Sequence, residues 1–197
     1  MGKGELTRER IVNAAAALAS RVGFDGLTIG GLADELKMSK SGLFAHFGSK
    51  EELQLQVLES EVARFEQTVF HPAIAHPRGE PRLRALFGHW LQWNCESPWP
   101  GGCLIVSASV EFDDRPGPLK EAIIDAQKRL LDAVARAAKL AVDAGHLAKG
   151  LEPDQFAFEV YGMVLSHHFI SRVKGDPKAD ERARAAFDAL LLRHRPR

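Results

Sequence analysis

The segment Ser39-Lys-Ser-Gly-Leu-Phe-Ala-His-Phe-Gly-Ser-Lys-Glu-Glu-Leu53 follows a shorter apolar one, Thr28-Ile-Gly-Gly-Leu-Ala-Asp-Glu-Leu36. Each segment opens on a hydroxyl residue that can cap a helix, so the pair predicts two short helices separated by a tight turn. A second hydroxyl residue, Ser49, starts a further helix with two acidic residues in its first turn. Two short helices joined in this way are typical of a helix-turn-helix, whose second helix enters the DNA major groove.

The spacing within the second helix predicts which of its side chains face outward. Leu43 and Phe47 are four residues apart and point to the core. The outward set is Lys40, Ser41, Gly42, Phe44, Ala45 and His46. Lys and His donate to phosphate, Ser donates to phosphate or a base edge, and Gly allows a close approach of the backbone. For Phe44, half-buried packing is an equal alternative.

This region resembles the N-terminal domain of the TetR family of bacterial repressors. The matching pieces are Thr28-Ile29, Leu32-Ala33, Met38 to Phe44, His46-Phe47 and Ser49 to Leu53, within residues 7–58. The resemblance implies that Lys40, Ser41, Gly42, Phe44, Ala45 and His46 face DNA and that Thr28 and Lys50 contact phosphate. The chain departs from the family at Phe44, where Tyr is frequent, and at Lys37, where Gly is frequent.

Bulk charge is uninformative about nucleic acid, because 26 basic residues balance 26 acidic ones among 197. Residues 1–50 carry seven basic and five acidic side chains, a mild local excess of positive charge that can attract DNA phosphates.

The two cysteines do not form a disulfide framework, and Cys95 and Cys103 are interpreted as ordinary thiols rather than a redox pair. With no membrane span or signal peptide in the pattern, we expect a cytoplasmic protein.

The hydrophobic pattern predicts an all-α chain of about nine helices, with no alternating strand pattern. After the first four helices, residues 71–81 are expected to be a linker, and further helices are expected over 82–95, 103–112, 118–143, 153–174 and 178–193. We predict two domains: a three-helix DNA-binding domain over 1–50, and an effector-binding and dimerisation domain over 51–197.

The helix predicted over 153–174 is apolar nearly all round. Phe156, Val160 and Val164 line one side, whereas Phe158 and Phe169 lie on another. Because a chain of this size offers one core, the second apolar side is expected to meet another copy of the protein. The helix over 178–193 would complete a two-fold four-helix contact.

Three tryptophans, Trp90, Trp93 and Trp99, lie within ten residues. Each one alone is compatible with ordinary helix packing. As a cluster they favour an aromatic-lined pocket for a small apolar effector, because the family that the chain resembles binds its effector among these helices. The predicted pocket residues are Phe87, Trp90, Trp93, Cys103, Phe112 and His167.

No metal, cofactor or catalytic constellation is predicted. His167 and His168 diverge on a helix, and Glu111, Asp113 and Asp114 are interpreted as a solvated helix end rather than a cation site. The sequence therefore predicts a ligand-responsive, homodimeric transcriptional regulator, a repressor acting on a palindromic operator. Two alternatives remain: a small-molecule-binding helical protein without DNA binding, and a helical enzyme using the Trp-rich region, which lacks a paired catalytic set.

Overall fold

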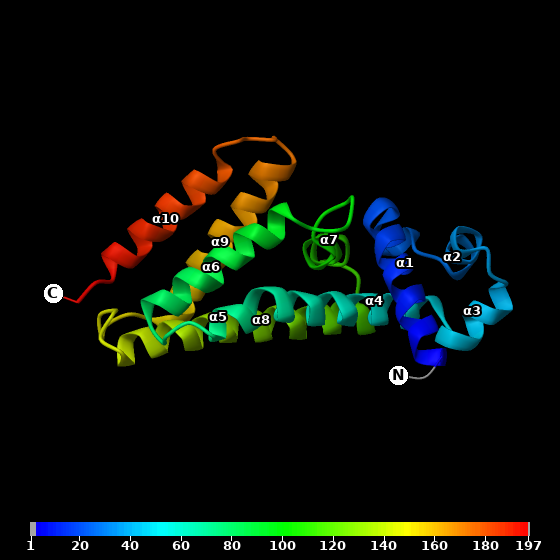
Figure 1. Cartoon of the computed structure of the whole chain (residues 1–197), viewed down its shortest axis with the longest axis horizontal. Coiled ribbons are helices and arrows are strands. Elements are labelled where there is room, and N and C mark those ends of the chain that lie inside the picture. The colour runs from blue at the N-terminus through cyan, green and yellow to red at the C-terminus, as the bar shows by residue number, and fades with distance from the viewer. Residues whose placement is uncertain (1–2, 197) are drawn as a thin grey trace. The chain divides into compact units, whose positions relative to one another are not determined.

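The computed structural model describes the backbone of residues 3–196 and the side chains of residues 8–196. Within this part of the chain the regular structure is helical throughout (Figure 1), which confirms the predicted all-α class. The elements are α1 (Lys3–Gly26), α2 (Ile29–Leu36), α3 (Lys40–Phe47), α4 (Lys50–Phe65), η1 (Glu66–Phe70), α5 (His71–Ile74), α6 (Glu80–Cys95), α7 (Leu104–Glu111), α8 (Pro118–Asp143), α9 (Pro153–Arg172) and α10 (Ala179–Arg193).

The chain forms two compact units. The first contains residues up to Arg64 together with Ser97–Ala126, and the second contains Phe65–Glu96 and the chain from Gln127 onward. In the first unit α7 packs on α1, so a segment far along the sequence joins the N-terminal helices. The predicted functional boundary at residue 50 stays a prediction, since compactness and function need not divide a chain at the same place. Among the described residues, no helix has both the length and the apolar character required to cross a bilayer.

The core of the first unit is made by the residues that the periodicity places inward. Ile11 and Ala15 of α1, Leu32 of α2 and Leu43 of α3 are all buried. Leu53 and Val57 bury the matching face of α4. Together these contacts hold α2 and α3 as a rigid pair, which is what a DNA-reading surface requires.

α1 is broken at Gly23, the residue at which the sequence predicts the first helix to end. Gly23 has φ +78° and ψ 167°, so the regular helix ends before it and a short helical turn follows. A side chain at this position would be strained by that positive φ, and its Cβ would also lie 3.0 Å from the Glu111 carboxylate. The positive φ is therefore the main reason for glycine at this break, and the nearby carboxylate would also have to shift slightly for a larger residue.

The predicted linker over residues 71–81 is only partly correct. Helical structure continues through η1 and α5 as far as Ile74, and α6 already begins at Glu80. α4, η1 and α5 follow one another without a gap, and Phe70 and His71 before Pro72 keep right-handed helical dihedral angles. Pro72 therefore lies within a continuous helical run that contains the π-helical segment η1, and α5 is added to the predicted helices.

The second unit is built around aromatic packing between α6, α9 and α10. The Phe87 and Phe187 rings stack with centroids 4.2 Å apart and planes inclined by 10°. Phe156 meets Phe187 edge-on with centroids at 6.5 Å. Phe65 contacts Trp90 and Trp93 edge-on at 5.4 and 5.3 Å. These offset and edge-to-face geometries are the favourable ones for aromatic pairs.

Candidate DNA-reading surface and effector region

The helix-turn-helix is set by local capping. The Thr28 hydroxyl accepts a hydrogen bond from the Gly31 N–H at 3.0 Å, and the Ser39 hydroxyl accepts one from the Gly42 N–H at 3.1 Å. Between them Lys37 adopts the left-handed conformation with φ 53° and ψ 40°. A non-glycine residue adopts this conformation at some cost, which gives a physical reason for the glycine that relatives often carry there.

α3 has one buried and one exposed side, as the spacing predicts. Leu43 and Phe47 are buried. The Arg8 guanidinium lies 5.7 Å from the Phe47 ring centroid. Of the residues predicted to face DNA, Lys40, Ser41, Phe44 and Ala45 are exposed, whereas Gly42 and His46 are half-buried. Phe44 is 56% exposed, so part of its ring packs against the protein while the rest faces outward.

The other two predicted contact residues lie at helix starts. Thr28 is exposed at the N-terminus of α2, and Lys50 is the first residue of α4. Ser49 accepts a hydrogen bond from the Glu52 N–H at 3.0 Å, so α4 begins where the sequence predicted. The DNA contacts of all eight residues stay a prediction.

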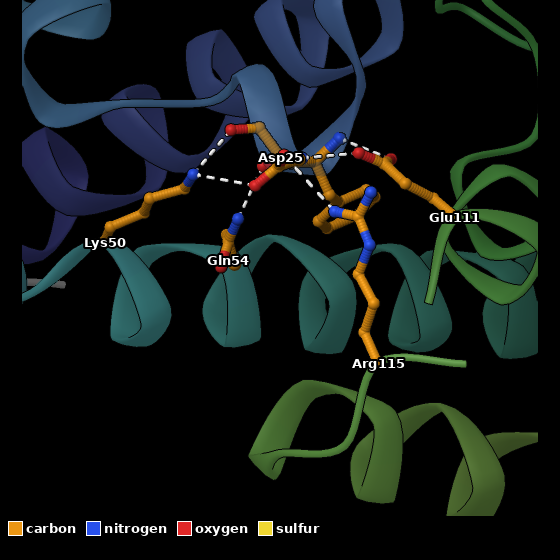
Figure 2. Close-up of polar contacts among 6 residues, drawn as sticks. Asp25, Lys50, Gln54, Glu111 and Arg115 are labelled. Atoms are coloured by element: carbon orange, nitrogen blue, oxygen red, sulfur yellow. Dashed lines mark hydrogen bonds and ion pairs between the residues drawn. The ribbon is translucent and has the colours of Figure 1, made fainter. Parts of the chain in front are cut away.

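Lys50 already has a partner in this structure, the Asp25 carboxylate. The Lys50 Nζ lies 3.1 Å from Asp25 Oδ1 and 2.5 Å from the Asp25 carbonyl oxygen (Figure 2). Arg115, in the loop between α7 and α8, lies 3.2 Å from the other oxygen, Asp25 Oδ2. Hydrogen bonding and charge from Lys50, then from Arg115, hold the pKa of Asp25 below its usual value.

The backbone beneath Asp25 is fixed by two further side chains, as Figure 2 shows. The Glu111 carboxylate accepts hydrogen bonds from the Phe24 N–H at 2.8 Å and the Asp25 N–H at 2.7 Å. The buried Gln54 amide donates to the Phe24 carbonyl at 2.5 Å. Glu111 is thus a cap for the turn after Gly23, and its interpretation as a solvated helix end was wrong. No sequence pattern joins residues so far apart, so the sequence analysis missed this cluster.

The predicted pocket residues are divided between the two units. In the second unit Phe87, Trp90 and Trp93 are buried in the aromatic packing described above. His167 is buried between α6 and α9, where its Nδ1 lies 3.2 Å from the Asn94 amide nitrogen. Burial lowers the pKa of His167, so this imidazole is neutral at physiological pH. His167 also lines a cleft of about 300 Å³ with residues of α9 and α10.

The remaining pocket residues belong to the first unit. Cys103 is buried immediately before α7, and Phe112 follows that helix with the Arg115 guanidinium 5.5 Å from its ring centroid. Trp99 lies in the loop before α7, with the Arg64 guanidinium 5.1 Å from its ring centroid. Cys95 is exposed, and desolvation raises the pKa of its thiol above the usual value.

Two family models match the chain, one in its N-terminal part and one in its C-terminal part. Residues 11–57 match the model described as bacterial regulatory proteins of the tetR family. Residues 79–187 match the Tetracyclin repressor-like C-terminal domain, which is more than half of the chain. A curated relative from Lactococcus lactis subsp. lactis, an HTH-type transcriptional regulator in the lacX 3′ region, is 23% identical over 131 residues; the match covers 64% of this chain and 67% of the relative.

Solved structures share the fold along nearly the whole chain. A TetR transcriptional regulator from Chloroflexus aurantiacus has a TM-score of 0.86 at 22% identity, covering 98% of this chain and 96% of its own. AibR in complex with isovaleryl coenzyme A and operator DNA has a TM-score of 0.76 at 23% identity, and the match covers 93% of this chain and 97% of AibR. The helix-turn-helix, the all-helical body and both family matches agree: the chain belongs to the TetR family of DNA-binding transcriptional regulators, which are not enzymes.

Proposed function

We propose that this regulator is a homodimeric repressor that binds a palindromic operator and is released from it by a small apolar effector. The observation that carries this proposal is the exposed face of α3, which presents Lys40, Ser41 and Phe44. The opposite side of the helix is held in the core by buried Leu43 and Phe47. A polar and basic helix face on a rigid core can enter a major groove and present hydrogen-bond donors to phosphate and base edges.

The proposed dimer forms through α9 and α10. Phe158, Leu165, Phe169 and Val173 recur at i, i+7, i+11 and i+15 along α9, which places them on one side of the helix. Phe158, Phe169 and Val173 are exposed there, and Leu192 is exposed on α10. Several large apolar side chains exposed on these two helices of a single chain favour an association site there. The two DNA-binding domains of such a dimer, about 34–36 Å apart, could then enter successive major grooves.

The direct test is an electrophoretic shift with the DNA that lies upstream of the protein's own gene, since such regulators frequently bind there. We expect a single retarded complex whose stoichiometry is one dimer per site. If the protein shifts no fragment of this region while still binding small apolar compounds, the alternative of a ligand-binding protein without DNA binding replaces the proposal.

Lys50→Ala is expected to weaken operator binding and to reduce the salt slope by about one unit, because one fewer phosphate is neutralised. The measurement is the operator dissociation constant over a range of salt concentrations. Lys139→Ala, an exposed position on the part of α8 in the second unit, is the matched control and should leave the slope unchanged. A slope equal to that of the unmodified protein would remove Lys50 from the contacts.

The proposed effector site uses the aromatic region. In the second unit, the His168 Nδ1 is buried without a hydrogen-bond partner among the described residues. A buried polar atom of this kind is energetically costly unless water or a ligand satisfies it. AibR has been solved with isovaleryl coenzyme A and operator DNA, which supports a short acyl group as one effector class to test.

An apolar effector bound at the aromatic region of the second unit is expected to quench the intrinsic fluorescence, because Trp90 and Trp93 lie in that region, whereas Trp99 belongs to the first unit. The measurement is a fluorescence titration with a compound panel that includes short acyl-coenzyme A esters. Single Trp→Phe variants at the three positions assign the signal, and the variant that loses the response identifies the contact. An inducer proven by operator release that leaves the fluorescence of every variant unchanged would place the pocket elsewhere.

A further inference from the structure

Asp25 is the meeting point of three segments of the first unit. Its carboxylate pairs with Lys50 at the start of α4 through one oxygen and with Arg115 after α7 through the other (Figure 2). A carboxylate oxygen beside an ammonium group occupies the same kind of position as a phosphate oxygen would. Asp25 therefore holds the lysine that is proposed to contact the operator backbone.

The position of Asp25 is built into the structure. Gly23 provides the turn, Glu111 binds the two N–H groups of Phe24 and Asp25, and Gln54 binds the Phe24 carbonyl. Because Gln54 is buried, this turn is anchored to α4 as well as to α7. The carboxylate is presented to Lys50 by a fixed backbone and not by a mobile loop.

The pair itself is exposed and exchangeable. The Lys50 side chain is 41% exposed and the Asp25 side chain 60% exposed. Pairs of this exposure contribute at most about 1 kcal/mol, because water screens the attraction. A duplex with its dense row of phosphates can therefore displace Asp25 from Lys50, whereas Arg115 remains to compensate the carboxylate.

Building on the proposed phosphate contact of Lys50, we propose that Asp25 is a regulatory carboxylate that competes with the operator backbone for Lys50. Operator binding exchanges the Lys50–Asp25 pair for a Lys50–phosphate pair. Arg115 weakens the hold of Asp25 on Lys50 by sharing its charge, so the position of the segment after α7 sets how easily Lys50 is released. By linkage, whatever moves that segment changes operator affinity, and operator binding changes the equilibrium of that segment.

The test is a double-mutant cycle between Asp25→Asn and Lys50→Ala on the full chain. Asp25→Asn is expected to tighten binding about two- to fivefold at low salt, the range set by a surface pair. The control is Asp34→Asn, an exposed aspartate on α2 with the same change of charge. The probes are the DNA upstream of the gene and a duplex of mixed sequence.

In the chain with Lys50, Asp25→Asn should increase DNA affinity more than Asp34→Asn does. When Lys50 is replaced by Ala, the increase from Asp25→Asn should fall to that of Asp34→Asn. Arg115→Ala should weaken binding more in the presence of Asp25 than in the Asp25→Asn background. Equal gains from the two asparagine variants, or a gain that persists without Lys50, would overturn the inference while leaving the proposed function intact. If neither the natural chain nor Asp25→Asn binds either probe, both proposals are overturned, whereas binding by Asp25→Asn alone supports the competition.

Discussion

Phe158→Glu is expected to convert the dimer into monomers and to lower operator affinity by about a hundred- to ten-thousandfold, the advantage that a second linked head provides. Phe158 is 69% exposed in the single chain, so its replacement removes little from the core of the second unit. On an apolar dimer surface, however, a buried carboxylate without a partner is strongly unfavourable. The measurement pairs sedimentation velocity with operator titration.

The control for this variant is Ile74→Glu. Ile74 is 57% exposed, also belongs to the second unit and lies on α5, which is not one of the two proposed dimer helices. It introduces the same charge at a similarly exposed apolar position, and we expect a dimer with unchanged affinity. Circular dichroism should show the same helical content for both variants. A Phe158→Glu protein that remains dimeric with full operator affinity would exclude the α9 surface as the dimer contact.

Gly101→Ala is expected to destabilise the protein by about 3 kcal/mol, as overpacking of a tightly packed site does. A Cβ on Gly101 would lie 1.8 Å from the Ser20 carbonyl oxygen and 2.7 Å from its carbon. Both atoms are backbone of α1, so no side chain can rotate away and the loop before α7 has to leave α1. The measurement is urea unfolding followed by circular dichroism and by tryptophan fluorescence.

Gly150→Ala is the matched control, because a Cβ there meets nothing within 4 Å. Its effect on the free energy of unfolding should lie within about 1 kcal/mol of zero and measures what the added methyl group does to the unfolded chain. Equal stabilities for the two alanine variants would show that the contact between the loop and α1 is not required for folding.

The DNA-reading region was predictable because its determinants are local. Thr28 and Ser39 cap the helices that follow them within three residues, and Leu43 and Phe47 define the buried side of α3 by spacing alone. The predicted limits of α2 agree with the structure for the same reason. The linker over 71–81 was misjudged because a proline that a helical run accommodates and a proline that ends a helix look identical in sequence.

Taken by itself, the sequence determined the all-α class, the helix-turn-helix, the buried side of α3 and the second apolar side of α9, since each follows from capping or periodicity within one helix. Only the tertiary structure decided that Glu111 caps the turn after Gly23, that Asp25 shares its charge between Lys50 and Arg115, and that Gly101 lies against the α1 backbone. These contacts join residues about 25 to 90 positions apart, and such pairings depend on how helices pack, which no local pattern specifies.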